Sequence, residues 1–169
     1  MYLSHTLERF PPWSTRRVSG FTLIELLITI VVLAVILGLA APSFQQQLTQ
    51  SRVTSAANEI LYMLQYARSE GLKRNLAVTF CPSNDQATCS GNWGDGSIVR
   101  RADTNEVLRV GGRPHESLTI TGPAQALTYI SAGYLQADPG ANFTLSAGGV
   151  TRRVCVSPIG VSRVSEENC

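Results

Sequence analysis

Few side chains in this sequence can do chemistry, and the most unusual is an acid inside an apolar run. Glu25 is the only charged residue between Phe21 and Ala41. An acid inside an apolar helix costs about 2.5 to 3.5 kcal/mol on membrane-insertion scales, so it usually has a partner. Either the Glu25 carboxylate reaches the lipid head groups at the membrane edge, or it pairs with a cation inside the membrane. Cleavage of the Gly20–Phe21 bond would supply that cation, because the new α-amine would lie four residues before Glu25.

The cysteines are the second chemical group. Four thiols allow three pairings, and no close C-x-x-C pair is present to favour a zinc site. We expect pairing between neighbours in the sequence, because closing a short loop stabilises the fold by restricting the unfolded chain. All four lie after the apolar run, which agrees with an oxidising compartment. The expected disulfides are Cys81 with Cys89 and Cys155 with Cys169, and no metal is expected.

Catalytic motifs are not found in the sequence. It contains no G-x-S-x-G, H-E-x-x-H or Walker loop. His115 is the only histidine after residue 20, and its neighbours Pro114 and Glu116 suggest a surface loop. We therefore expect neither enzymatic activity nor a cofactor.

Length and composition set the scale of the protein. The chain has 169 residues, enough for one domain with an appendage, and this size excludes a large multidomain enzyme. Charged residues are 15% and hydrophobic residues 44%, so the chain is poor in charge and can still build a core. The formal net charge of +2 is too small to indicate a polyanionic partner by itself.

The apolar run from Phe21 to Ala41 has the length of one bilayer crossing. Arg9, Arg16 and Arg17 precede it against Glu8, and basic residues near a span tend to stay cytoplasmic. This predicts a cytoplasmic N-terminus and an exported remainder. A cleaved signal peptide, a plain signal anchor and a twin-arginine export signal are the alternatives, although the run is longer than a signal peptide's usual apolar core of about 7 to 15 residues.

The helix is expected to continue beyond the span. Pro42 should kink or locally melt it, because proline removes a backbone donor. From Ser43 to Lys73, apolar residues recur mostly at steps of three and four, which predicts an amphipathic helix. The expected buried stripe consists of Leu48, Val53, Ala56, Ala57, Ile60, Leu61, Leu64, Ala67 and Leu72.

After Asn75 the pattern changes to short runs rich in Val, Ile, Thr and aromatic residues, separated by turn residues. This predicts an antiparallel sheet that packs on the amphipathic helix, an α+β fold. Turns are expected at Gly148–Gly149 and at Asp103–Asn105. The expected parts are 1–20, 21–41, 42–75 and 76–169, and the expected strands are 77–80, 97–100, 106–110, 117–121, 126–130, 142–146 and 150–157.

The string GFTLIELL at residues 20–27 resembles the class III signal of type IV pilins and type II secretion pseudopilins. The resemblance implies that residues 1–20 are a prepilin leader. It also implies that a prepilin peptidase cuts after Gly20 and N-methylates Phe21, and that Glu25 pairs with the terminal amine of an adjacent subunit. Pro42 falls where the family commonly has a helix-breaking proline.

The second half is similar to the GspH/FimT family of minor pilins and pseudopilins, FimU-type pilins included. The matching stretches are LQYARSEGLKRN at 64–75, Trp93 with Gly96, ISAGYL at 130–135 and RRVCVSPIG at 152–160. The resemblance implies a pilin-like fold and a structural subunit that primes or caps a type IV pilus or type II secretion pseudopilus. Its partners would be the prepilin peptidase, other major and minor pilins or pseudopilins, and the inner-membrane assembly platform. It would sit in the inner membrane with its C-terminal domain in the periplasm, then in the fibre.

An alternative is a DNA-binding minor pilin that acts in natural transformation. Without residues 1–20, the chain loses three of 14 basic and one of 12 acidic side chains, which leaves 11 of each and no bulk attraction to DNA. Some FimT-type members bind DNA through a G-R-x-R loop, and the matching stretch at 160–163 has Val161 in place of the first arginine. A local cluster would need Arg100, Arg101, Arg109, Arg113, Arg152, Arg153 and Arg163, of which Arg152, Arg153 and Arg163 are the candidate DNA contacts.

Overall fold

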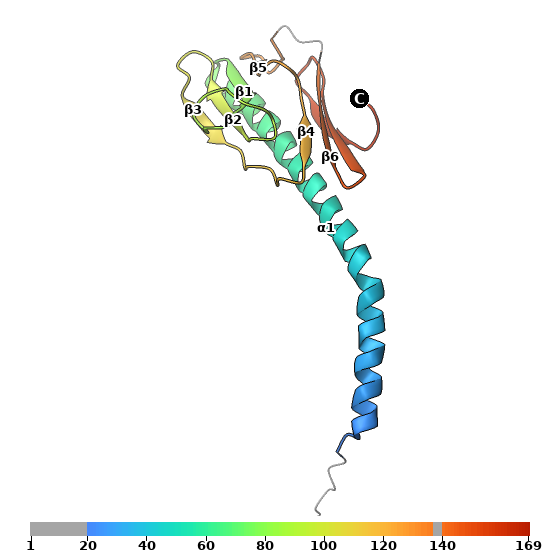
Figure 1. Cartoon of the computed structure of the whole chain (residues 1–169). Helices are drawn as coiled ribbons and strands as arrows, with labels where there is room; N and C mark the ends of the chain where they lie inside the picture. The colour runs from blue at the N-terminus through green and yellow to red at the C-terminus, as the bar shows by residue number, and fades with distance from the viewer. Residues whose placement is uncertain (1–19, 137–139) are drawn as a thin grey trace, which may run out of the picture. The chain divides into compact units, whose positions relative to one another are not determined.

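A single long helix, α1 (Leu23–Arg74), opens the part of the chain that the structure describes. The structure is a computed structural model and describes residues 20–136 and 140–169, so Arg9, Arg16, Arg17 and Glu8 of the expected leader lie outside it. The chain forms two units, Met1–Ala41 and Pro42–Cys169. Every buried apolar side chain of the described residues belongs to the second unit, which contains all the strands drawn in Figure 1.

Pro42 lies inside α1 rather than at its end. The local melting expected there is therefore wrong, while the expected kink stays a prediction. Proline removes one backbone N–H from the helix, and the hydrogen bonds of the turns on either side do not need that donor.

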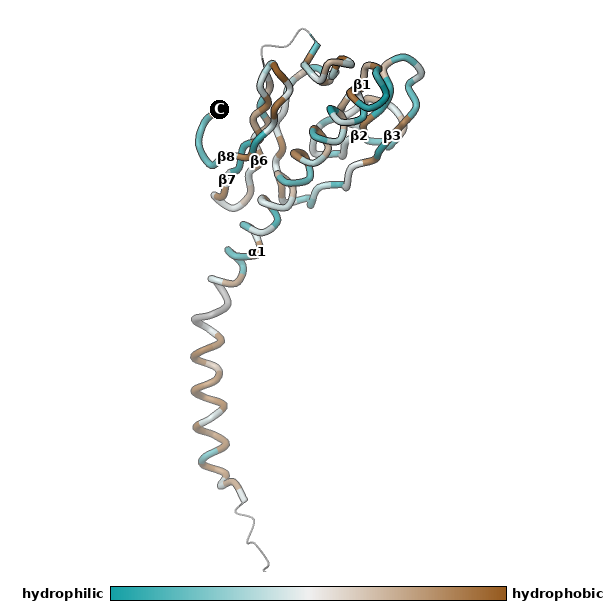
Figure 2. Tube along the Cα trace, turned by 180° about the vertical axis from the view of Figure 1, so that it is seen from behind, coloured by the Kyte–Doolittle hydropathy of each residue, from teal (hydrophilic) through white to brown (hydrophobic). Residues whose placement is uncertain are grey.

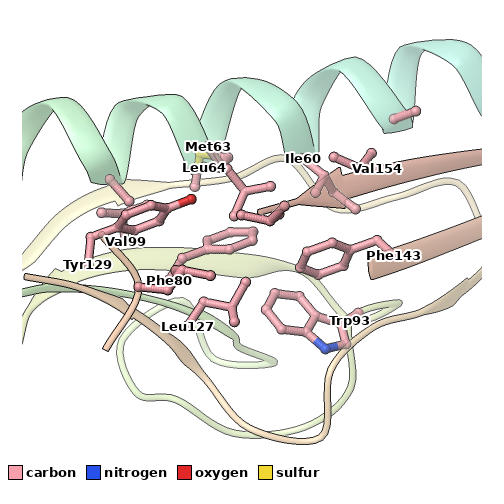
Figure 3. Close-up of a cluster of buried hydrophobic side chains, with 14 of the residues drawn as sticks. Ile60, Met63, Leu64, Phe80, Trp93, Val99, Leu127, Tyr129, Phe143 and Val154 are labelled. Atoms are coloured by element: carbon pink, nitrogen blue, oxygen red, sulfur yellow. The ribbon is translucent and has the colours of Figure 1, made fainter. Parts of the chain in front are cut away.

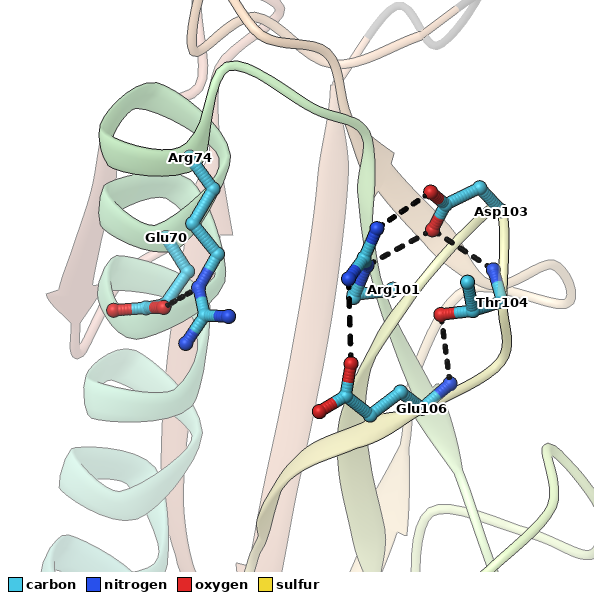
Figure 4. Close-up of polar contacts among 6 residues, drawn as sticks. All are labelled: Glu70, Arg74, Arg101, Asp103, Thr104 and Glu106. Atoms are coloured by element: carbon cyan, nitrogen blue, oxygen red, sulfur yellow. Dashed lines mark hydrogen bonds and ion pairs between the residues drawn. The ribbon is translucent and has the colours of Figure 1, made fainter.

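The C-terminal end of α1 is closed by the backbone. Asn75 adopts a left-handed conformation with φ of 54°, and the Leu76 N–H donates to the Gly71 carbonyl at 3.2 Å. This six-to-one hydrogen bond is that of a Schellman cap, for which asparagine is one of the suited residues. The buried Glu70 pairs with Arg74 (Figure 4) and also with Lys73, at 3.9 Å. The two basic residues of the last helical turn thus pair with an acid of the same helix end.

The strands form two four-stranded antiparallel sheets. The first has the order β3-β2-β1-β5 and the second β4-β6-β7-β8, so the chain leaves the first sheet for β4, returns for β5 and then stays in the second. The strands are β1 (Val78–Pro82), β2 (Ser97–Arg101), β3 (Val107–Val110), β4 (Thr119–Thr121), β5 (Leu127–Tyr129), β6 (Ala141–Ala147), β7 (Val150–Val156) and β8 (Ser162–Ser165).

The expectation of one sheet needs correction, because the strands divide between two. All seven expected strands are present with bounds shifted by a few residues, and the expected turns join two pairs of neighbouring strands, β2 with β3 and β6 with β7. β8 was not expected, since it contains only one apolar residue. Strand β8 pairs with β7, and in this pairing Val164 lies opposite Val154.

The core forms where the second half of α1 faces both sheets (Figure 3). The stripe expected on the helix is confirmed between Val53 and Ala67, with Met63 as a buried member that the spacing missed. Leu48 and Leu72 are wrong as core residues, because their side chains remain 41% and 50% exposed near the two ends of the segment that the sheets cover.

Three aromatic rings join the two sheets beneath the helix. Phe80 of β1 and Phe143 of β6 lie 6.0 Å apart between centroids, and Trp93 contacts both, at 5.0 and 4.8 Å. The Trp93 indole N–H donates to the Pro123 carbonyl at 3.0 Å, so its polar atom is satisfied. Each edge-to-face or tilted pair of this kind stabilises the fold by about 0.5–1.5 kcal/mol more than the burial of its apolar surface alone. The rings therefore fix how the two sheets meet in the core.

Both expected disulfides are present, Cys81–Cys89 and Cys155–Cys169. The first closes a loop that is organised around Asp85. The Asp85 carboxylate accepts hydrogen bonds from the Ala87 and Thr88 backbone N–H groups, at 2.9 and 2.8 Å, and from the Thr88 hydroxyl at 2.6 Å. The Ser83 hydroxyl adds another at 2.9 Å. These bonds, those from Thr88 foremost, hold the pKa of Asp85 well below its usual range.

Two loops of the domain meet at Gly160. The Leu135 N–H donates to the Pro158 carbonyl at 3.1 Å, and the Arg68 Nε–H donates to the Gly133 carbonyl at 2.9 Å. Gly160 has a φ of 79°, and a Cβ there would run into the Gly133 carbonyl. A side chain at this position would therefore meet both backbone strain and a steric clash.

We expect Gly160→Ala to lower the thermal midpoint of the domain by several degrees more than Gly149→Ala. Gly149 has nearly the same φ, 81°, but a Cβ there would meet nothing within 4 Å. Both variants place a side chain at a positive φ and so share the backbone strain. The difference between their midpoints therefore measures the steric clash at Gly160. Circular dichroism of the 43–169 fragment measures the two midpoints, and equal losses would show that the contact with Gly133 is unimportant.

Acid should weaken the disulfide loop through Asp85. Its pKa is lower in the folded state, so the stability that it contributes is present above the unfolded pKa of about 4 and is lost as the pH falls below that value. In Asp85→Asn we expect lower stability at pH 7 and a flatter decline between pH 5 and 2. Urea midpoints across this range measure both effects, with Glu116→Gln as the control for removal of a surface charge. Parallel curves of urea midpoint against pH for wild type and Asp85→Asn would show that the Asp85 carboxylate does not stabilise the folded state.

Candidate functional site

The apolar part of α1 begins with a side-chain cap. The Glu25 N–H donates to the Thr22 hydroxyl at 3.3 Å, and the Leu26 N–H donates to the Thr22 carbonyl at 3.2 Å. Thr22 is therefore the N-cap, and Glu25 stands three residues after it in the first turn, as in a capping box. This role of Thr22 was not expected, although the T-x-x-E spacing of residues 22–25 signals it.

Gly20 and Phe21 lie before the first helical residue and are exposed. The bond expected to be cut thus stands outside the helix, next to its cap. Cleavage there would create a cation at the positive end of the helix dipole, within one turn of the Glu25 carboxylate. The arrangement places the expected amine and acid at the same end of one helix, as the sequence predicts.

The helix that follows exposes apolar side chains on every face. None of the residues described between Phe21 and Gly38 is buried, and Figure 2 shows this stretch as the longest apolar part of the trace. α1 is long and apolar enough to cross a membrane by length and composition. A helix that is apolar all round must be covered by lipid or by other helices. Glu25 is the one acid in this otherwise apolar surface.

The arginines that the DNA-binding alternative would need in one cluster are instead divided between the two sheets and the connection from β3 to β4. Arg101 of β2 forms ion pairs with Asp103 and Glu106 (Figure 4), and its hydrogen bonds lower the pKa of the Asp103 carboxyl. Arg109 of β3 packs over the rings of Tyr62 and Tyr66, at 4.6 and 5.3 Å from their centroids. These cations already have partners within the chain.

The candidate DNA contacts lie on the second sheet, but not as a free cluster. Arg152 of β7 pairs with Glu166 at 2.8 Å, and the Arg153 guanidinium donates to the Glu166 carbonyl at 3.5 Å. Arg163 of β8 is exposed and sits opposite Cys155 in the register. The DNA-binding alternative therefore gains no support from the arrangement of its arginines.

His115 lies in an exposed loop, as expected, with its Nδ1 2.9 Å from the Ser117 hydroxyl. Within residues 20–136 and 140–169, no group of three His, Cys, Asp or Glu side chains is placed to hold a metal ion.

The family model for type II transport protein GspH matches residues 56–160, more than half of the chain. The chain belongs to the GspH family. A second model, the prokaryotic N-terminal methylation motif, matches residues 15–41 and so includes Gly20, Phe21 and Glu25. The two matches together cover the start of the apolar helix and most of the globular unit of this GspH-family chain.

Solved structures confirm a pilin-like α+β fold for this member of the GspH family. The type IV minor pilin FimU of Pseudomonas aeruginosa is 25% identical with a TM-score of 0.58, over 68% of this chain and 89% of that one. The minor pseudopilin EpsH of Vibrio cholerae is 14% identical with a TM-score of 0.50, over 68% of this chain and 96% of that one, and supports the fold alone. No curated protein matches the sequence.

The paired and dispersed arginines predict weak binding of DNA. We expect the 43–169 fragment to leave duplex DNA unshifted in gels at about 150 mM salt, because its basic side chains do not form one continuous patch. Arg163→Ala should make no difference. A shift that weakens steeply with salt and is lost in Arg163→Ala would restore the DNA-binding alternative.

Proposed function

We propose that this protein is a minor pilin or pseudopilin, a structural subunit that helps to prime or cap a type IV pilus or a type II secretion pseudopilus. The observation that supports this most directly is an exposed apolar helix with one acid in its first turn, directly after a Gly–Phe bond. The match to the N-terminal methylation motif covers the same residues.

The proposed sequence of events starts in the inner membrane. The basic leader stays in the cytoplasm, the helix from Phe21 to Ala41 spans the bilayer, and the globular domain folds in the periplasm, where its two disulfides persist. A prepilin peptidase then cuts after Gly20 and methylates the new terminal amine of Phe21. The subunit keeps its apolar helix and gains a cation next to its acid.

Assembly exchanges lipid for the helices of other subunits. Apolar contact alone favours the two environments similarly, because lipid tails are as apolar as Leu and Ile side chains. The Glu25 carboxylate breaks this balance, since its unpaired charge is costly in lipid. Pairing with the terminal amine of a neighbouring subunit removes that cost, and each subunit offers one amine and one acid. The assembly platform and the other pilins or pseudopilins are the proposed partners.

We expect Glu25→Val to be inserted and processed normally but to be at least roughly tenfold poorer in sheared fibres, because a hydrogen bond to a charged group is worth about 1.5 kcal/mol or more. Glu25→Asp, which keeps the charge, should retain more incorporation than Glu25→Gln, which keeps the size. Immunoblots of fibre and membrane fractions measure incorporation, and N-terminal sequencing of the membrane form checks processing.

Normal incorporation of Glu25→Val would contradict the pairing. A mature chain that begins after Ala40 would remove the apolar helix and the whole proposal with it.

A further inference from the structure

We propose that a groove between α1 and the connection from β3 to β4 receives an apolar, carboxylate-bearing segment of a neighbouring fibre subunit. The groove has a volume of about 390 Å³ and lies within the globular unit. Helix residues from Ser51 to Ile60 form one wall, residues 112–120 form the other, and Trp93 lies between them. This inference rests on the proposed function, since it names how the subunit contacts another.

The connection that forms the second wall is held in place next to the helix. The Gly111 N–H donates to the Ser97 carbonyl at 2.8 Å, and the Gly112 N–H donates to the Glu59 carboxylate at 3.4 Å. A Cβ on Gly111 would lie 2.6 Å from the Ser97 hydroxyl and 3.2 Å from the Met63 methyl group, so a larger residue there would require these side chains to move. The groove is therefore a preformed feature of the fold, which lowers the entropic cost of binding.

The floor of the groove continues the hydrophobic core. Ile60 and Trp93 belong to the core and are each 7% exposed, while Leu118 and Ile120 pack against it from the second wall. The Trp93 N–H is already bonded to the Pro123 carbonyl, so what the floor offers a partner is apolar contact. A concave apolar site of this kind suits an anchoring side chain, the usual centre of a protein interface.

The rim adds a charge preference. Arg52 and Arg113 both line the groove and are exposed, and within the described ranges neither forms an ion pair with a carboxylate. Arg101, Arg152 and Arg109, by contrast, are paired or stacked within the chain. Glu59, the acid on the groove wall, accepts the Gly112 N–H. Two free guanidiniums beside an apolar floor favour an apolar anchor flanked by Asp or Glu.

A photoreactive p-benzoylphenylalanine at Ser51, on the rim, tests the proposal in cells that assemble fibres with the full-length protein. The control carries the same residue at Gln50, which is exposed on the same helix and does not line the groove. After irradiation, mass spectrometry of sheared fibres should find the Ser51 probe joined to another subunit, within a few residues of an Asp or Glu. We expect the Gln50 probe to give this product at least about tenfold less.

Charge variants test the role of the rim. Arg52→Glu combined with Arg113→Glu should lower the yield of the Ser51 crosslink at least about tenfold, while the corresponding Lys variants should keep most of it. Reversing the charge of the acid identified in the partner should restore the crosslink to the Glu variant.

Several results would overturn the groove assignment. A protein that enters fibres but gives no crosslink between subunits from Ser51, or gives only nucleic acid or lipid products, excludes a subunit as the occupant and leaves the proposed function standing. An unchanged yield of the Ser51 crosslink in the variant with both arginines replaced by Glu excludes the charge preference. It would also exclude a carboxylate-bearing segment as the occupant of the groove. Absence of the wild-type chain from fibres would overturn the proposed function and this inference together.

Discussion

The burial of one stripe of α1 against two sheets is the interaction on which the globular unit depends. Neither sheet covers the stripe alone, because the core contains residues of α1, of β1, β2 and β5 in the first sheet, and of β6 and β7 in the second. The sheets meet at the rings of Phe80, Trp93 and Phe143, directly beneath the helix (Figure 3). Removing the helix would expose the inner faces of both sheets, so the stripe, the sheets and the rings form one cooperative unit.

The same helix has a different surface in its first half, where no side chain of the described residues is buried. One secondary-structure element therefore serves two environments. Its apolar half needs lipid or other helices, while its amphipathic half needs the sheets of its own chain. The first-turn acid and the Thr22 cap define where the apolar half begins. This division suits a subunit that must remain folded while its apolar helix changes surroundings.

The partners of each charge decide which surface features remain free for other molecules. Glu70, Asp85 and Asp103 are engaged in local hydrogen bonds or ion pairs, as are Arg101 and Arg152. These contacts stabilise helix ends and loops and leave little charge to attract a polyanion. The free guanidiniums of Arg52 and Arg113 beside the groove are therefore more informative than the number of arginines in the sequence, whose clustering the DNA-binding alternative required.

The sequence by itself determined the features that depend on neighbours along the chain. The apolar run with Glu25, the helical stripe, the two turns and both disulfides are visible in spacing, because helices, turns and short closed loops are local structures. The tertiary structure alone decided the division into two sheets, the pairing of β1 with β5 and of β4 with β6, and the presence of β8. Strand pairing joins residues far apart in sequence, and alternation of apolar residues does not specify which strand is the neighbour. The groove and the dispersal of the arginines follow from that pairing, so they became visible only in three dimensions.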